Sequence, residues 1–357
     1  MSKRHQTLGI QMAAALILLM TIAYLLTPLE KPSDNRPSVT HPYTSSSPDR
    51  VKAAFVILAR NSDLTGIRST IRQIEDRFNR KFKYPYVFLN DDDFTKDFKT
   101  YTSLLTQADT FYGKVDKSMW GYPSFINQTR AAESREDMAR REIIYGGSES
   151  YRHMCRRLEP DVNYFCDIDY DVFQMMKDNG YLYGWTISLT EYMNTIPTLW
   201  DTAVEFWKKY PEYVVVGKDS IMQWLTDDDF ETQIGSLDFL RSEKYIKFFD
   251  HLDHAGGFFY ERWGDAPVHS LAVASMLRKD QIHFFNDIGY KHNPLMHCPT
   301  ESYLQKSCHC PKEENFDWEG WSCATRYKLL DPHFVWGEKT FRDKTAPYRA
   351  SPSTCIA

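Results

Sequence analysis

The sequence predicts an α/β fold with a mixed, mostly parallel sheet flanked by helices, behind one N-terminal transmembrane helix. Three observations predict it. Apolar strand-like runs alternate with amphipathic helical segments from about residue 51 onward. A 20-residue apolar run lies near the N-terminus, and a proline-rich segment separates it from the rest. The composition, with 42% apolar and 15% aromatic residues, excludes a disordered, collagen-like or coiled-coil chain.

The charge balance argues against a protein that binds nucleic acid. The 357 residues include 43 basic and 48 acidic side chains, which gives a formal net charge of −5. A nucleic-acid-binding protein is expected to be basic or to carry a basic stripe. We therefore expect no nucleic-acid partner.

The N-terminal residues predict a signal-anchor. Lys3 and Arg4 precede the apolar run Leu8–Thr27, which is long enough for a helix to cross the hydrocarbon core of a membrane. Because Lys and Arg are retained on the cytoplasmic side, residues 1–7 are predicted as a cytoplasmic tail and the rest as lumenal. A cleaved signal peptide is the alternative, but the residues that follow the run make a poor cleavage site.

Residues 28–50 are predicted to form an extended stem. They contain five prolines among serines and threonines, and they offer almost no apolar side chains to bury. The folded part is then predicted to span residues 51–357, which is long enough for one large α/β domain.

The first part of this domain predicts two strands around a helix. Residues 51–59 form a continuous apolar run, which is typical of a buried parallel strand. Asp63 can cap the helix that follows. One face of this helix collects four apolar side chains, namely Ile67, Ile71, Ile74 and Phe78. Residues 84–89 predict a second strand, and the acidic run 90–93 follows it.

The alternation continues along the rest of the domain. Helices are predicted over residues 130–143, 170–179, 199–210, 242–254 and 266–278. Strands are predicted over residues 162–165, 181–189 and 281–285. The pair Gly256-Gly257 is a typical end for the fourth of these helices. The cysteine-bearing tail from Cys298 onward has little periodicity, so we expect it to wrap the domain surface.

Four cysteines of the tail are predicted to form disulfides rather than a zinc site, because a lumenal compartment oxidises thiols. They are Cys298, Cys308, Cys310 and Cys323. The chain has seven cysteines, so at least one is left outside the intramolecular bridges.

Four groups of polar residues are candidate sites. They are Glu159 with Asp161, Glu231 in the acidic turn 227–231, the run Tyr260–Asp265, and His292 after a predicted strand. Each group alone could be a solvated loop or a helix cap. Together they suit an enzyme that neutralises a sugar diphosphate with a divalent cation held by carboxylate and imidazole ligands. A separate carboxylate would then face the anomeric carbon.

Six runs of the sequence carry a more specific signal. They are Ile57–Leu64, Gln73–Phe82, Phe88–Asp91, Tyr145–Arg156, Glu159–Val162 and Gly256–Ser270. These runs closely resemble the fungal Golgi α-1,2-mannosyltransferases of glycosyltransferase family 15, over about residues 51–323. The N-terminal anchor and short stem also match the layout of that family.

The resemblance implies a GT-A type fold and a retaining, Mn²⁺-dependent transfer of mannose. The donor would be GDP-mannose, and the acceptor a mannosylated glycan or glycoprotein whose N-linked or O-linked chain is extended. It also implies a single-pass type II protein of the Golgi membrane, held by its N-terminal helix with the catalytic domain in the lumen. The sequon that starts at Asn127 is the expected N-glycosylation site.

The resemblance also assigns roles to five residues. Glu159 and His292 match the metal ligands, and Glu231 matches the proposed nucleophile. Arg60 and Asp265 match donor-site residues on the nucleotide side and the mannose side, respectively. Retention requires either a carboxylate on the opposite face of the sugar or attack on the face of the leaving group, and the resemblance leaves this choice open.

This chain departs from the family pattern in two places. Between Arg156 and Arg157 the family carries an aromatic-rich segment that is absent here. Before Glu231 the family usually has a Cys-His-Phe-Trp run, where this chain has Asp227–Asp229 and an additional Thr232-Gln233 follows. These gaps motivate one alternative to the leading hypothesis, a catalytically impaired Golgi binding protein. The resemblance implies a second alternative, a mannosylphosphate transferase of the same family.

Overall fold

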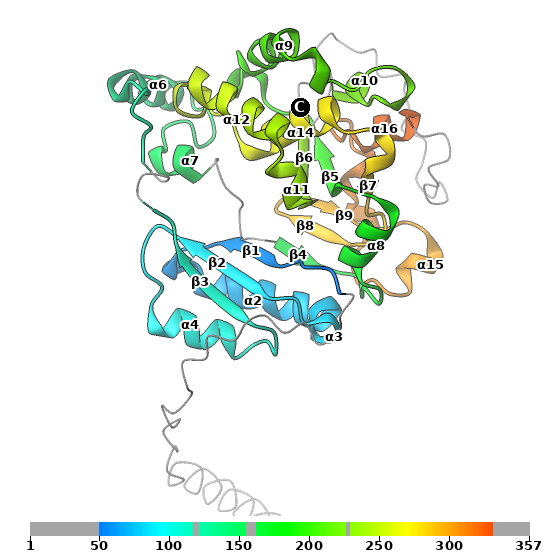
Figure 1. Ribbon diagram of the computed structural model, residues 1–357. Coiled ribbons are helices and arrows are strands. Elements are labelled where there is room, and N and C mark those ends of the chain that lie inside the picture. Colours follow the sequence, from blue (N-terminus) through cyan, green and yellow to red (C-terminus); the bar gives the residue numbers. More distant parts are fainter. Residues whose placement is uncertain (1–49, 117–120, 155–161, 226–228, 331–357) are drawn as a thin grey trace, which may run out of the picture. The chain divides into compact units, whose positions relative to one another are not determined.

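The structure is a computed structural model that describes residues 50–116, 121–154, 162–225 and 229–330 (Figure 1). The chain divides between Arg50 and Val51 into two compact units, and every helix and strand given below lies in the second unit. Within the described residues, no helix is both long and apolar enough to cross a membrane. The predicted membrane-spanning run Leu8–Thr27 and nearly all of the predicted stem lie outside the described residues.

Three parallel strands form the first sheet, in the order β1-β2-β3. They are β1 Phe55–Leu58, β2 Tyr86–Asn90 and β3 Thr110–Lys114. The predictions of β1 and β2 as parallel strands are confirmed, but β1 is an edge strand without a buried residue, so its expected burial is wrong. Strand β3 was not predicted, because its sequence Thr-Phe-Tyr-Gly-Lys is polar at both ends and lacks the continuous apolar run that identified β1.

Two helices pack against one face of this sheet, α2 Leu64–Ile74 and α4 Lys96–Ser103 (Figure 1). The predicted apolar face of α2 is buried and packs with Tyr86 and Phe88 of β2. The helix continues into a π-helical turn, Glu75–Asn79, and then into the short α3, Arg80–Phe82. The helix and the sheet therefore enclose one hydrophobic layer.

The second sheet has β5 Tyr183–Leu189 as its central strand. Strand β6 Asp229–Gly235 pairs with it antiparallel, and β7 Ile282–Phe284 pairs with it parallel. The largest hydrophobic cluster surrounds this sheet. Three long helices contribute to that cluster: α9 Leu199–Lys209, α12 Glu243–Ala255 and α14 Asp265–Met276.

The predicted acidic turn is wrong for residues 229–231, because the strand β6 begins at Asp229 and runs through Glu231, whereas residues 227–228 lie outside the described residues. Its register pairs Glu231 with Ile187 of the central strand. Phe230, Thr232 and Ile234 alternate with the more polar Glu231 and Gln233, and such a period of two residues is typical of a strand. The neighbouring aspartates concealed this alternation.

The third sheet is antiparallel throughout. It contains β4 Val162–Tyr164, β8 Tyr290–His292 and β9 Leu295–His297. Among the described strands, three pairs are parallel and three are antiparallel, so the expectation of a mostly parallel sheet is wrong. Parallel strands need a crossover, often a helix, whereas antiparallel strands can be joined by a short hairpin. The alternation of strands with helices therefore favoured parallel pairs and did not predict the antiparallel ones.

The tail from Cys298 is partly buried, which corrects the expectation that it wraps the surface. Helix α16 Ala324–Leu330 places the ring of Tyr327 5.0 Å from the rings of both Trp185 and Trp224. The remaining α-helices of the described chain are α6 Gln128–Arg140, α7 Glu149–Met154, α8 Val172–Asn179, α10 Met222–Leu225, α11 Leu237–Leu240, α13 Gly257–Tyr260 and α15 Ser302–Gln305.

Candidate active site

The carboxyl ends of the parallel strands β1 and β2 carry one candidate residue and an acidic loop. Arg60 follows β1, is exposed, and donates its backbone N–H to the Asp63 carboxylate at 2.8 Å. The Asn61 side chain ties this loop to the next one, because it donates to the Asp93 carbonyl at 3.0 Å and accepts from the Thr95 N–H at 2.9 Å. In α/β proteins, ligands bind outside this edge of the sheet, so Arg60 is well placed to meet a ligand.

His292 lies at the end of β8 and is half-buried. Its register partner is Val162, the first residue of β4. Glu159 precedes Val162 by three residues and lies outside the described residues. The structure therefore places His292 beside the point where the chain from Glu159 enters the sheet.

The second and third sheets meet in one hydrophobic cluster. Ile187 of β5 packs there with Tyr290 of β8 and Leu295 of β9. The backbone of Glu231 is paired with Ile187, and His292 is paired with Leu295. The strands that carry Glu231 and His292 are thus joined through this shared core.

Asp265 is the first residue of α14, which packs against β6. Burial and the negative charge of Asp265 together raise the pKa of Tyr245. The Tyr245 hydroxyl lies 2.6 Å from Nδ1 of His269, one turn further along α14. A burial effect lowers the pKa of His269 to about 4, so this imidazole is neutral at pH 7. Asp265 and His269 therefore flank Tyr245 on the helix that lies against β6.

A buried arginine links two further residues that the sequence did not single out. Arg262 is 7% exposed, and it donates to the Tyr151 hydroxyl at 2.9 Å and to the Glu191 carboxylate at 3.3 Å. Tyr151 belongs to α7, and Glu191 comes directly after β5. The position of Glu191 at the carboxyl end of a predicted strand was a usable signal. The partnership with Tyr151 had no signal in the sequence.

The run between α13 and α14 is held in place by Glu261. Its carboxylate accepts hydrogen bonds from the Thr198 hydroxyl at 2.7 Å and from the Trp263 ring N–H at 2.6 Å. Trp263 is fully buried. This run therefore positions Arg262 and Asp265 on a rigid support.

Asn127 is the N-cap residue of α6 and is exposed. Its side-chain oxygen accepts from the Arg130 N–H at 3.1 Å, and its backbone N–H donates to the Tyr260 hydroxyl at 2.8 Å. Because Asn127 is exposed, its side-chain nitrogen is a suitable attachment point for an N-glycan.

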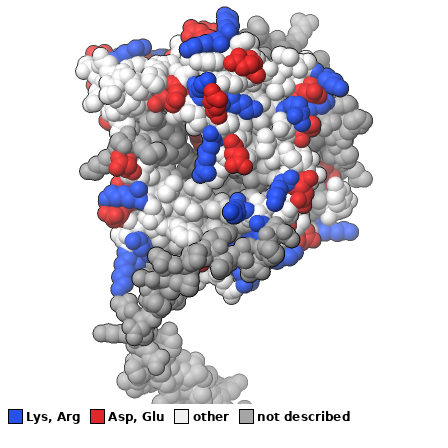
Figure 2. Space-filling view, viewed as in Figure 1, with Lys and Arg blue, Asp and Glu red and all other residues white. Residues whose placement is uncertain are grey.

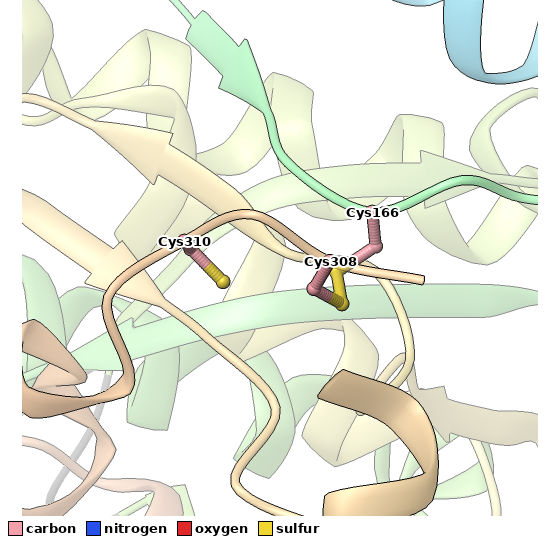
Figure 3. Close-up of side chains that lie close together, drawn as sticks. All are labelled: Cys166, Cys308 and Cys310. Atoms are coloured by element: carbon pink, nitrogen blue, oxygen red, sulfur yellow. A yellow bond between two sulfur atoms is a disulfide. The ribbon is translucent and has the colours of Figure 1, made fainter. Parts of the chain in front are cut away.

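Three cysteine sulfur atoms, those of Cys166, Cys308 and Cys310, lie within 4.8 Å of one another (Figure 3). They belong to two disulfides, Cys166–Cys308 and Cys298–Cys310. Because disulfide sulfur cannot act as a thiolate ligand, this group is not a metal site in the oxidised protein. The disulfide prediction is confirmed for three of the four tail cysteines.

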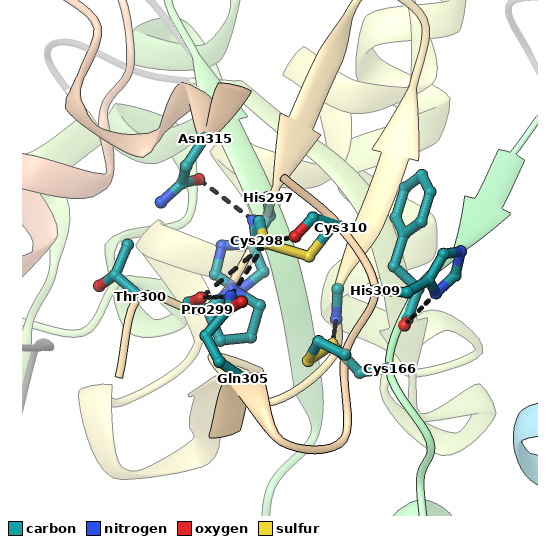
Figure 4. Close-up of a disulfide and its surroundings, with 12 residues drawn as sticks. Cys166, His297, Cys298, Pro299, Thr300, Gln305, His309, Cys310 and Asn315 are labelled. Atoms are coloured by element: carbon teal, nitrogen blue, oxygen red, sulfur yellow. Dashed lines mark hydrogen bonds between the residues drawn. A yellow bond between two sulfur atoms is a disulfide. The ribbon is translucent and has the colours of Figure 1, made fainter. Parts of the chain in front are cut away.

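Cys323 is buried and takes part in neither of these two disulfides. Cys166, next to β4, takes part instead. The second disulfide is enclosed by polar contacts of Cys298, whose N–H donates to Asn315 at 3.2 Å and whose Sγ accepts from Gln305 at 3.3 Å (Figure 4). The Cys166–Cys308 disulfide therefore ties the tail to the chain beside β4, whereas the second disulfide and these polar contacts lie within the tail.

The charged side chains on the face shown in Figure 2 alternate in sign and do not gather into one basic stripe. This distribution differs from the single-sign surface typical of proteins that bind nucleic acid.

A family profile described as "Glycolipid 2-alpha-mannosyltransferase" matches residues 25–156 and 157–331. The chain belongs to this family. It is therefore a glycosyltransferase. The two matched parts meet between Arg156 and Arg157, the position at which we expected a segment of the family to be missing.

Curated relatives of this mannosyltransferase family resemble most of the chain. Glycolipid 2-alpha-mannosyltransferase 1 of Candida albicans is 48% identical over an alignment of 314 positions, which covers 79% of this chain and 72% of the relative. Glycolipid 2-alpha-mannosyltransferase of Saccharomyces cerevisiae is 43% identical over an alignment of 331 positions, which covers 84% of this chain and 74% of the relative.

Two solved structures share the fold. Core-mannan synthase A from Aspergillus fumigatus, in its Mn/GDP form, matches with a TM-score of 0.74 and 35% identity, covering 81% of this chain and 87% of that one. The mannosyltransferase Ktr4p from Saccharomyces cerevisiae, in complex with GDP, matches with a TM-score of 0.75 and 35% identity, covering 79% and 82%.

Proposed function

We propose that this chain transfers mannose from GDP-mannose to a mannosylated glycan or glycoprotein, forming an α-1,2 linkage with retention of configuration. The observation that carries the proposal is the match of most of the chain to structures solved with GDP and with Mn. The names of the curated relatives supply the α-1,2 linkage. The fold is then of the GT-A type.

The donor site is proposed to include Arg60 and Asp265. Arg60 is exposed at the carboxyl end of β1, where a guanidinium can pair with a diphosphate. Asp265 is the residue proposed to contact the mannose. It is the first residue of α14, and it lies three residues after Arg262, which is held by hydrogen bonds to Tyr151 and Glu191.

Glu159 and His292 are proposed to bind the cation. A carboxylate and an imidazole form a donor set that suits Mn²⁺. His292 is half-buried opposite Val162, and three residues of chain reach at most about 11 Å, so Glu159 is within reach of the same cation. When bound, Mn²⁺ neutralises the charge that develops on the GDP leaving group.

Glu231 is proposed as the carboxylate that faces the anomeric carbon. Its backbone belongs to β6, which pairs with β5 at Ile187, and Ile187 packs beside the strand of His292. A strand is a more rigid support than the acidic turn expected from the sequence.

We further propose that Leu8–Thr27 anchors the protein in the Golgi membrane as a single-pass type II protein, and that Asn127 carries an N-glycan. The apolar run and the basic residues before it support the first part. The exposed position of Asn127 at the start of α6 supports the second.

Product analysis tests the reaction. The purified full chain is incubated with GDP-mannose, methyl α-mannoside and Mn²⁺. We expect a neutral dimannoside that an α-1,2-specific mannosidase cleaves. An anionic, acid-labile product would instead support mannosylphosphate transfer. Binding of GDP and Mn²⁺ without any product would support the impaired binding protein, the alternative motivated by the two departures from the family pattern, between Arg156 and Arg157 and before Glu231.

A further inference from the structure

An open groove lies along α6 and is lined by none of the residues of the proposed donor and metal sites. It encloses about 400 Å³, which is within the usual range for ligand pockets. One side is formed by α6, with Glu133, Asp137 and Arg141 at intervals of about one turn. The opposite side is formed by Asn194 and Glu261.

The lining of this groove, which we call the α6 groove, is polar but balanced in charge. Asp137 pairs with Arg141 at 3.4 Å, and the Glu261 carboxylate is already held by Thr198 and Trp263. Glu133 and Asn194 are exposed polar side chains on the two sides of the groove. A strongly charged ligand is disfavoured because charges of both signs line the groove.

A neutral ligand with many hydroxyl groups suits such a lining. Each hydroxyl can donate to a carboxylate and accept from an amide or guanidinium. The groove also offers apolar surface from Met138, Pro197 and the ring of Tyr260, against which the C–H face of a sugar can pack. One face of the Tyr260 ring is covered by the Arg130 guanidinium, 4.0 Å from the ring centroid.

Two short segments connect the α6 groove to the candidate active site. The first starts at Glu191, a partner of Arg262, and reaches the groove at Asn194. The second starts at Glu261 in the groove and reaches Asp265 four residues later. Both segments are fixed by hydrogen bonds, so the groove holds a constant position relative to the Arg262 network.

We propose that the α6 groove binds a neutral, mannose-rich oligosaccharide, namely the part of the acceptor that precedes the sugar receiving the new mannose. This rests on the proposed function. The same chemistry has a second source, the N-glycan proposed at Asn127, because the backbone of Asn127 donates to Tyr260 in the groove wall.

The experiment compares acceptors of increasing length. With GDP-mannose and Mn²⁺, KM is measured for methyl α-mannoside and for α-mannotetraose in the purified full chain. The test variant is Glu133→Gln with Asn194→Ala. The control variant is Glu136→Gln, an exposed residue of the same helix that does not line the groove. A further variant, Asn127→Gln, removes the sequon.

We expect the wild type and the control to have a lower KM for the tetraose than for methyl α-mannoside. The test variant should raise KM for the tetraose about three- to tenfold, which corresponds to one or two hydrogen bonds, and leave KM for methyl α-mannoside unchanged. If the advantage of the longer acceptor emerges only in Asn127→Gln, the groove binds the protein's own glycan and the acceptor assignment is overturned.

The failure of this inference is distinguishable from the failure of the proposed function. Equal KM values for both acceptors in the wild type and in Asn127→Gln, with transfer intact, would overturn the α6 groove as a sugar site and leave the function standing. If no acceptor is mannosylated, the binding of mannotetraose alone is measured by calorimetric titration. Binding that is lost in the test variant would support the α6 groove as a sugar site. Absence of binding in Asn127→Gln would overturn it.

Discussion

His297 and Asp317 form a buried ion pair beside the third sheet. Nδ1 of His297 lies 2.8 Å from the Asp317 carboxylate, and Nε2 lies 3.0 Å from the carbonyl of Asn286. The two side chains are 0% and 2% exposed. Burial alone would lower the pKa of His297, but the charge of Asp317 and the hydrogen bonds to Asp317 and Asn286 outweigh it and raise this pKa. The protonated imidazole can donate to both partners.

This pair predicts a pH dependence of stability. A raised pKa in the folded state means that the pair stabilises fully below the ordinary pKa of 6.5, and that this contribution is lost as the pH rises through the higher folded value. We expect the free energy of unfolding of the wild type, measured by urea denaturation, to fall as the pH rises from about 6.5. Asp317→Asn should lower it by about 3 kcal/mol at pH 6 and flatten this fall. The same pH slope in both proteins would contradict the assignment.

Single residues were predictable where a local pattern fixes them. Arg60 follows a predicted strand and Asp265 lies at the start of a predicted helix, and the structure has them there. His292 ends β8, a strand that was not predicted. The Arg262 network was not predictable, because its partners are 111 and 71 residues away in the sequence. Such hydrogen bonds depend on how helices and strands pack, which no periodicity encodes.

At the scale of elements, the run from Gly256 to Asp265 supports the candidate site. Gly256 ends α12 with a φ of 79°, a left-handed conformation that favours glycine. Gly257 begins α13, and a Cβ atom at this position would lie 2.0 Å from the Trp263 ring. The close approach lets the buried Trp263 bond to Glu261 and hold the segment that leads to Asp265.

We therefore expect Gly257→Ala to lower the free energy of unfolding by about 1–3 kcal/mol, because the added methyl group must displace a buried indole. Transfer of mannose should fall as well, since the displacement is transmitted to Arg262 and Asp265. Thermal unfolding and a transfer assay measure the two effects. Gly320→Ala is the matched control, since no atom lies within 4 Å of its added Cβ. Equal results for the two variants would rule out this packing role.

Helices and strands whose apolar residues repeat regularly were predicted, whereas short or exposed ones were missed. Helix α2 places buried Ile67 and Ile71 on one face, and this amphipathic pattern was readable in the sequence. The hairpin of β8 and β9 has three residues in each strand, which is too short for a period to stand out. The edge strand β3 has no buried residue, and β6 begins in an acidic run. Their pairing partners, not their own sequences, decide that they are strands.

For the whole molecule, one disulfide joins the tail to Cys166 beside β4, and the other lies within the tail. Cys166–Cys308 connects residues 142 positions apart, whereas Cys298–Cys310 connects residues 12 positions apart. In the chain-entropy model, a disulfide that closes a longer loop restricts the unfolded chain more strongly. Cys166–Cys308 is therefore expected to contribute more to stability, and it is also the bridge that holds the tail near β4.

Replacing Cys166 and Cys308 together by Ala should lower the free energy of unfolding by about 2–5 kcal/mol. Replacing Cys298 and Cys310 together should cost about 2 kcal/mol less, because the loop is shorter. Denaturant unfolding of the two double variants and of the wild type measures the difference. A larger loss from the second pair would contradict the loop-closure explanation.

The most direct test of the proposed activity is the dependence of mannose transfer on Mn²⁺ and its two proposed ligands. Transfer from GDP-mannose to methyl α-mannoside is measured with Mn²⁺ and with a chelator, in the wild type and in Glu159→Ala, His292→Ala and His254→Ala, the last an exposed histidine that serves as control. We predict transfer by the wild type and the control only with Mn²⁺, and a loss of at least about 100-fold in the other two variants. Unchanged transfer in Glu159→Ala and His292→Ala, or transfer that persists in chelator, would contradict the proposed metal site.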